Sequence, residues 1–165
     1  MSTTTTETTQ VYRVYIRAMP QAIWDAITKP EWTERYGYPS RAEWDPELRA
    51  GATYRAVATE EMRKAGLPEV AVIGEVIEAD PPRKLVLTWQ AQWEPVEEAT
   101  RLTYEIEAGE GGVSKLTVIH ELAGAPGLAR MLSGELESTG AGGGWTQVLS
   151  DLKTLLETGN GLYGS

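Results

Sequence analysis

Few side chains in this sequence have the chemistry for catalysis or metal binding. The chain has one histidine, His120, and no cysteine. This composition excludes a disulfide framework, a thiolate nucleophile, a cysteine zinc site and a multi-histidine metal centre. No serine lies in a G-x-S-x-G motif, so a nucleophilic serine would have to use His120 as its base. We expect no metal and no other cofactor, and His120 is the one candidate for a catalytic acid or base.

His120 alternates with Leu116 and Val118 in a segment of strand character, so the three side chains share one face. Three roles for the imidazole remain open. It could be a structural histidine hydrogen-bonded to a buried Trp or Tyr, a polar anchor for a ligand, or a general acid or base. The sequence offers no convincing second catalytic group, which favours binding over catalysis.

The remaining acidic and glycine-rich motifs have simpler explanations. Each of the pairs at 60–61 and 97–98 is Glu-Glu in a predicted loop, where a solvated surface position is expected. Glu75 lies on a predicted strand whose alternation is ambiguous, so both a surface and a pocket position stay open. The glycine-rich segment before Trp145 lacks the Gly-Lys-Ser/Thr ending of a phosphate loop, so its glycines are expected to let the chain turn into a helix.

The aromatic composition is unusual, because six Trp and seven Tyr are accompanied by no Phe. Every ring therefore carries a polar N–H or O–H group that needs a partner when it is buried. An unpaired group of this kind costs about 1–3 kcal/mol. Trp89 and Trp93 share a strand face with Leu85 and Leu87. Such rings either fill the core or surround a space in which water or the acceptor groups of a ligand satisfy them.

The chain carries a net charge of −9 and has a pI near 4.7. This balance argues against nucleic acid and against an anionic membrane surface as partners, since both attract clustered Lys and Arg. No segment reaches the ~18 apolar residues that span a bilayer, and the Thr-rich start is not a secretory signal. We therefore expect a cytoplasmic protein with a disordered tail at 1–9, a single domain at 10–158 and a flexible tail at 159–165.

The hydrophobic periodicity predicts an α+β domain with an antiparallel sheet. Pro20 and Pro30 begin two short helices after the first strand, the second of them at 31–36. A helical turn is expected at 60–65 and another near 128–132, inside a glycine-rich connection at 123–144. The clearest amphipathic helix starts at Trp145. The predicted strands are 11–17, 42–44, 53–58, 70–79, 84–93, 101–108 and 113–122.

Four strings resemble the START-like, or birch-pollen-allergen-like, helix-grip superfamily, known as SRPBCC proteins. They are VYRVYIRAMPQAIWDAITKPEWTERY (11–36), GEVIEADPPRKLVLTW (74–89), LTVIHEL (116–122) and GGWTQVLSDLKTLLE (143–157). Within the superfamily the chain looks most like the family named after the activator of the heat-shock-protein ATPase. The resemblance implies a curved sheet of six to seven strands wrapped around the C-terminal helix, with an apolar cavity between them.

Members of this superfamily include ligand carriers, polyketide cyclases, co-chaperones and self-resistance proteins of antibiotic producers. The resemblance and the aromatic pattern together predict a non-catalytic protein that binds a hydrophobic, polyketide- or lipid-like small molecule as a monomer or homodimer. A cyclase or hydrolase using His120 as its acid or base is one alternative, and a co-chaperone-like or sequestering protein is another. The expected ligand contacts are Tyr54, Trp89, Trp93, Tyr104, His120, Met131, Trp145 and Leu149.

Overall fold

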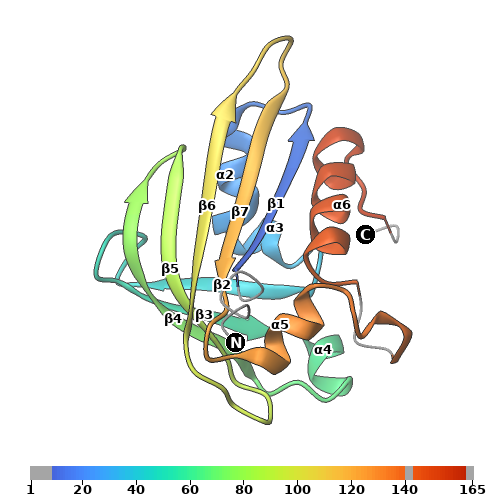
Figure 1. Cartoon of the computed structure of the whole chain (residues 1–165). Helices are drawn as coiled ribbons and strands as arrows, with labels where there is room; N and C mark the ends of the chain where they lie inside the picture. Colours follow the sequence, from blue (N-terminus) through green and yellow to red (C-terminus); the bar gives the residue numbers. More distant parts are fainter. Residues whose placement is uncertain (1–8, 140–142, 163–165) are drawn as a thin grey trace, which may run out of the picture.

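A seven-stranded antiparallel sheet forms the framework of the molecule (Figure 1). The computed structural model describes residues 9–139 and 143–162. Across the sheet the strands follow the order β1-β7-β6-β5-β4-β3-β2. They are β1 (Thr9–Ile16), β2 (Ser40–Asp45), β3 (Thr53–Ala58), β4 (Val70–Asp80), β5 (Lys84–Ala91), β6 (Thr100–Ala108) and β7 (Ser114–Glu121).

The helices occupy the connections between strands. The first two, α2 (Pro20–Thr28) and α3 (Pro30–Thr33), each begin at a proline, whose fixed φ suits a first helical turn. Lys29 is extended between them, as expected for a residue that precedes proline. The later helices are α4 (Glu60–Lys64), α5 (Pro126–Leu132), the short 3-10 helix η1 (Glu137–Thr139) and α6 (Gly144–Thr158).

The sheet curves around α6. In Figure 1, β2 and β3 run across β6 and β7 while α6 lies beside β1. Register shifts at Ala56/Val57 and at Val76/Glu78 bend β3 and β4, as bulges generally do. The inner side of α6 buries Trp145, Leu149, Leu152 and Leu155. This arrangement confirms the predicted α+β helix-grip fold, with two short helices after the first strand.

The predicted strand faces are largely correct. Leu116, Val118 and His120 on β7 are all fully buried. On β4 the side chains of Val72 and Val76 point inward, so Glu75 lies on the exposed face. The ambiguity at Glu75 is therefore resolved in favour of the surface.

Several element boundaries differ from the prediction. β5 ends at Ala91, so Trp93 lies in the following loop rather than on the strand. The second short helix is α3, which ends at Thr33, because the chain then turns towards β2. The turn expected near 128–132 is the helix α5, which begins at Pro126.

Both ends of the chain are held where the structure describes them. Residues 1–8, 140–142 and 163–165, which fall in the predicted tails and the glycine-rich connection, lie outside the described residues. Thr9 belongs to β1 and pairs with Glu121. Gly159 ends α6 with a φ of +89°, and the backbone N–H of Leu162 donates to Asp151 Oδ1 at 2.8 Å. The backbone of Leu162 thus hydrogen-bonds to α6, and residues 163–165 of the predicted flexible tail lie outside the described residues.

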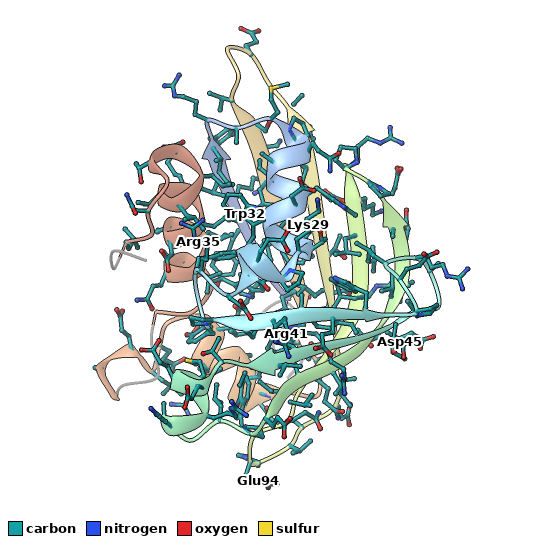
Figure 2. All side chains as sticks on the ribbon, turned by 180° about the vertical axis from the view of Figure 1, so that it is seen from behind. Lys29, Trp32, Arg35, Arg41, Asp45 and Glu94 are labelled. Atoms are coloured by element: carbon teal, nitrogen blue, oxygen red, sulfur yellow. The ribbon has the colours of Figure 1, made fainter. Side chains whose placement is uncertain are left out.

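Charged side chains project from the outer surface of the molecule. Figure 2 shows Lys29, Arg41, Asp45 and Glu94 on this surface, and all four are exposed. None of the helices in the described ranges is long and apolar enough to cross a membrane.

Candidate functional site

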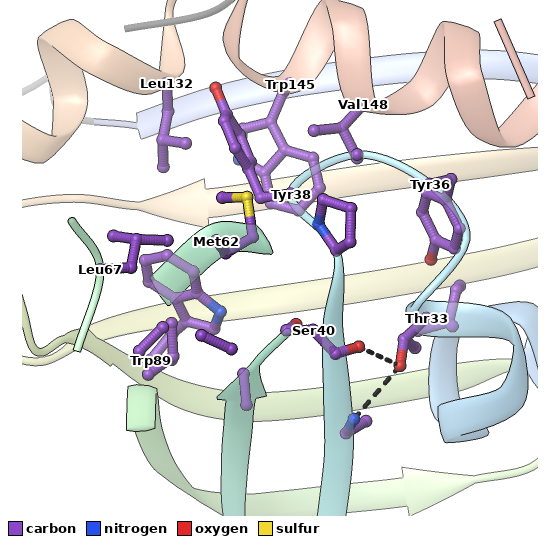
Figure 3. A pocket seen from close by; sticks show the side chains of 18 of the residues that line it. Thr33, Tyr36, Tyr38, Ser40, Met62, Leu67, Trp89, Leu132, Trp145 and Val148 are labelled. Carbon is purple, nitrogen blue, oxygen red and sulfur yellow. Dashed lines mark hydrogen bonds between the residues drawn. The ribbon is translucent and has the colours of Figure 1, made fainter. Parts of the chain in front are cut away.

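A pocket of about 450 Å³ lies between the inner face of the sheet and α6 (Figure 3). This volume falls within the range of small-molecule sites in proteins. Its walls come from strands β2 to β7, from helices α2 to α6, from the segments 36–40 and 65–67, and from Trp93. Seven of the eight predicted contacts line it: Tyr54, Trp89, Trp93, Tyr104, Met131, Trp145 and Leu149.

Aromatic rings form much of the pocket wall. Trp89 and Trp93 meet edge to face, with ring centroids 6.3 Å apart and planes at 78°. Tyr104 and Trp145 meet in the same way at 6.2 Å and 80°. Edge-to-face pairs of this kind fix the orientation of each ring, because the positive edge of one ring faces the negative face of the other. The wall is therefore both apolar and defined in shape.

His120 is the predicted contact that the structure keeps out of the pocket. It is fully buried, and it lies edge to face against Trp89 at 5.4 Å and against Trp145 at 6.0 Å. The indole N–H of Trp145 donates to His120 Nδ1 at 3.1 Å. Nδ1 therefore carries no proton, which places the ring proton on Nε2.

The other ring nitrogen of His120 is also occupied. Nε2 lies 2.8 Å from Thr100 Oγ1 and donates to it, while the Thr100 hydroxyl donates to the carbonyl of Trp89 at 2.7 Å. Burial lowers the pKa of His120 to about 3, so the ring is neutral at pH 7. The imidazole thus positions Trp89 and Trp145 from behind the wall, and both of its nitrogens are used. This geometry matches the first of the three roles left open by the sequence, a structural histidine hydrogen-bonded to a buried Trp. His120 is not among the described lining residues, and its predicted contact with a ligand stays a prediction.

Three tyrosines, Tyr36, Tyr54 and Tyr104, are among the residues that line the pocket. Burial raises the pKa of Tyr36, Tyr54 and Tyr104 above the ordinary value for a phenol. The pKa of Tyr104 is raised further by the phenol groups of Tyr36 and Tyr54, because a negative charge on Tyr104 would lie close to their oxygens. All three phenols are therefore protonated near neutral pH and act as hydrogen-bonding groups.

No described residue of the pocket lining is Asp, Glu, Lys, Arg or His. General acid–base catalysis near pH 7 needs a group that titrates in that range, and the protonated tyrosines do not. The described residues also contain no group of three or more His, Asp or Glu side chains that could hold a metal ion. The arrangement suits the binding of a neutral molecule.

Comparisons with known proteins agree with the fold. The family model for Activator of Hsp90 ATPase homolog 1-like proteins matches residues 17–157. The chain belongs to this family. A search of curated protein sequences found no match.

Solved structures that resemble this Hsp90-activator-like chain share its fold at low sequence identity. An HSP90 activator from Plasmodium falciparum is 18% identical, with 91% of this chain and 96% of that chain covered and a TM-score of 0.63. The Aha1 dimer from Colwellia psychrerythraea is 16% identical, covers 93% and 98%, and has a TM-score of 0.63. DynU16, from the dynemicin biosynthetic locus, is 19% identical over 93% of this chain and 49% of that chain, with a TM-score of 0.63.

The mouth of the pocket in this family member was not predicted from the sequence. The pocket opens beside Tyr38 and Gly66, which are exposed and belong to segments 36–40 and 65–67. The Tyr38 side chain hydrogen-bonds the backbone of Gly144 at the start of α6. Thr33 fixes the same segment, because its hydroxyl donates to the carbonyl of Ser40 at 2.7 Å (Figure 3). The signal in the sequence was the Tyr36-Gly-Tyr38 string, which follows a short helix and precedes a strand.

Glu97 is a second residue whose role the sequence did not reveal. It was expected on the solvated surface, but its carboxylate accepts the backbone N–H groups of Gly127 and Leu128 at 2.9 and 3.0 Å. These are orphan donors in the first turn of α5, which an anionic side chain stabilises. Glu97 thereby ties the loop that carries Trp93 to the helix that carries Met131, and both of these residues line the pocket.

Proposed function

We propose that this chain is a binding protein for a hydrophobic, ring-containing small molecule, held between the sheet and α6. The observation that carries the proposal is a pocket of about 450 Å³ walled by Trp and Tyr, with no charged side chain among its described lining residues. Apolar walls with a few fixed polar groups are typical of sites that bind and orient organic ligands. The occurrence of DynU16 in the dynemicin biosynthetic locus supports a polyketide-like ligand class.

The side chains in and behind the pocket wall favour binding without catalysis. The single imidazole is neutral and occupied on both nitrogens, and the phenols that reach the pocket are protonated at pH 7. A cyclase or hydrolase would need a proton donor or acceptor that contacts its substrate and titrates near the working pH. A protein that only sequesters its ligand needs no such proton donor or acceptor.

The experiment is a titration of intrinsic Trp fluorescence with a panel of aromatic polyketides and of neutral and anionic lipids. Half of the six Trp residues line the pocket, so occupancy changes the emission. We expect a saturable change with neutral polycyclic compounds. Absence of any saturable change across the panel would overturn the proposal.

A dimer is a second property that one comparison favours. The structure from Colwellia psychrerythraea is of a dimer, and it covers almost the whole of this chain. Of the two states expected from the sequence, monomer and homodimer, we propose the homodimer. Sedimentation equilibrium tests this directly, and a monomer mass would contradict it.

A further inference from the structure

The most informative feature of the pocket, beyond its size, is the state of two of its hydroxyl groups. Tyr54 on β3 and Tyr104 on β6 both line it. No hydrogen bond joins either hydroxyl to a described residue, whereas Tyr36, beside them, donates to the carbonyl of Ala26 at 3.0 Å. Every fully buried side-chain nitrogen or oxygen among the described residues does have a partner. The hydroxyls of Tyr54 and Tyr104 therefore reach the pocket space itself.

We infer that the ligand of this pocket is a neutral, flat ring system with a carbonyl-type oxygen, which accepts hydrogen bonds from Tyr54 and Tyr104. This inference rests on the proposed binding function and names the chemical class of its ligand. A quinone, a cyclic ketone or a lactone of a fused-ring compound has this chemistry.

The two hydroxyls act as donors. Burial raises the pKa of both phenols, so each keeps its proton through the neutral range. A phenol O–H that faces an apolar site without a partner is costly, and an acceptor oxygen on the ligand removes that cost. A hydrocarbon of the same shape offers no acceptor, so the cost of the unpaired O–H remains.

The indole rings of the pocket wall explain the flat ring system. Trp89 and Trp93 present ring surfaces held by their edge-to-face contact, and Trp145 is held by His120 behind it. Fixed aromatic surfaces bind another ring through stacked or edge-to-face contacts without losing side-chain freedom.

The lack of charged side chains in the described pocket lining explains why the ligand should be neutral. No described lining residue carries a positive or negative charge. A carboxylate brought into such a site loses its hydration and finds no cation, which is strongly unfavourable. Fatty acids and other anionic lipids are therefore excluded when their charged group has to enter the pocket.

Three probes built on one fused-ring frame test this inference by isothermal titration calorimetry: fluorene, fluorenone and a fluorenone carboxylate. Fluorene and fluorenone differ only in the carbonyl, and the third probe adds a charged carboxylate group to fluorenone. We expect fluorenone to bind most tightly, fluorene roughly three- to tenfold more weakly for each donated hydrogen bond that is lost, and the carboxylate not measurably.

Hydroxyl-deletion variants assign the effect to the two phenols. Tyr54→Phe and Tyr104→Phe retain the ring, so each should weaken fluorenone binding roughly three- to tenfold while fluorene binding stays unchanged or tightens. Tyr15→Phe is the matched control, because Tyr15 is exposed on β1 and does not line the pocket. It should bind all three probes like the wild type, and circular dichroism checks that each variant is folded.

The outcomes separate this inference from the proposed function. Equal binding of fluorene and fluorenone by the wild type, or an unchanged fluorenone affinity in both pocket variants, would overturn the inference and leave the binding function standing. Tight binding of the carboxylate would also overturn it. Failure of all three probes to bind would count against the proposed function itself.

Discussion

Trp145 donates its indole N–H to His120 Nδ1 across 3.1 Å, which joins the first turn of α6 to the end of β7. This bond occupies one nitrogen of the only imidazole in the chain. Thr100 occupies the other. His120, the residue with the most obvious catalytic chemistry, thus supports the aromatic wall of the pocket from behind.

Removing the imidazole should destabilise the fold. In His120→Leu the buried N–H of Trp145 loses its acceptor, and we expect a loss of about 1–3 kcal/mol in the free energy of unfolding. Urea denaturation followed by circular dichroism measures this loss. His120→Gln is the matched control, since an amide can both accept from Trp145 and donate to Thr100, and its loss should be smaller. A His120→Leu variant as stable as the wild type would contradict the structural role.

The same histidine predicts a pH dependence of stability. Burial lowers its pKa to about 3 in the folded state, whereas the unfolded side chain titrates near its ordinary value of 6.5. The unfolded chain therefore binds this proton first, so His120 contributes stability above pH 6.5 that is lost as pH falls towards 3. The slope reaches about 1.4 kcal/mol per pH unit.

The comparison of wild type with His120→Gln isolates this contribution from the carboxylates, which both proteins share. We expect the wild type to lose more stability than the variant between pH 6.5 and 4, and the two slopes to agree above pH 7. Parallel curves over the whole range would show that the imidazole titrates normally when folded.

Gly37 should be intolerant of a side chain at the pocket mouth. Its φ is +65°, and a Cβ there would lie 3.2 Å from Val148 Cγ1 on α6. Gly37→Ala should cost about 1–2 kcal/mol for the left-handed backbone alone, and more for the contact with Val148. Thermal denaturation gives the difference.

A matched glycine separates the two costs. Gly111 has a φ of +66°, and a Cβ there would meet nothing within 4 Å. Gly111→Ala should therefore show the backbone cost alone, and adding Val148→Ala to Gly37→Ala should reduce the excess. An excess that persists after Val148→Ala would mean that another contact is responsible.

Narrowing the pocket should weaken binding without unfolding the protein. Ala56 lies on β3, is buried and lines the pocket. In Ala56→Leu the larger side chain should occupy part of the pocket and weaken fluorenone binding by at least about tenfold, because overlap of atoms is repulsive. The unfolding midpoint should stay within a few degrees of the wild type, since the added methyl groups enter open space.

Ala99→Leu is the control for this substitution, because Ala99 is exposed in the loop before β6 and does not line the pocket. It should leave both binding and stability unchanged. A folded Ala56→Leu variant that retains wild-type affinity would place the ligand elsewhere on the molecule.

The sequence predicted the framework well because hydrophobic periodicity reports burial directly. Strand alternation placed Leu116, Val118 and His120 on one buried face, and the spacing of three and four from Trp145 onward identified α6. The same patterns oriented Trp89 and Tyr104 towards the pocket that they line. These side chains are positioned by local backbone geometry, which periodicity captures.

The parts that the sequence did not reveal depend on contacts between distant segments. Periodicity put His120 on the inner face, but only the folded structure shows that Trp145 and Thr100 bind both of its nitrogens. Glu97 looked like a surface residue because its partners, the N–H groups at the start of α5, follow it by 30 residues. The mouth at 36–40 has no periodic pattern, since hydrogen bonds to Thr33 and Asp151 hold it in place.

The central claim, that the aromatic pocket binds a small molecule, is tested most directly by nuclear magnetic resonance. The six indole N–H signals of the protein divide evenly: Trp89, Trp93 and Trp145 line the pocket, whereas Trp24, Trp32 and Trp44 do not. On titration with fluorenone we predict saturable shifts of the first three signals, with the other three nearly unchanged. Shifts confined to Trp24, Trp32 and Trp44, or no saturable shift in any of the six, would contradict the account.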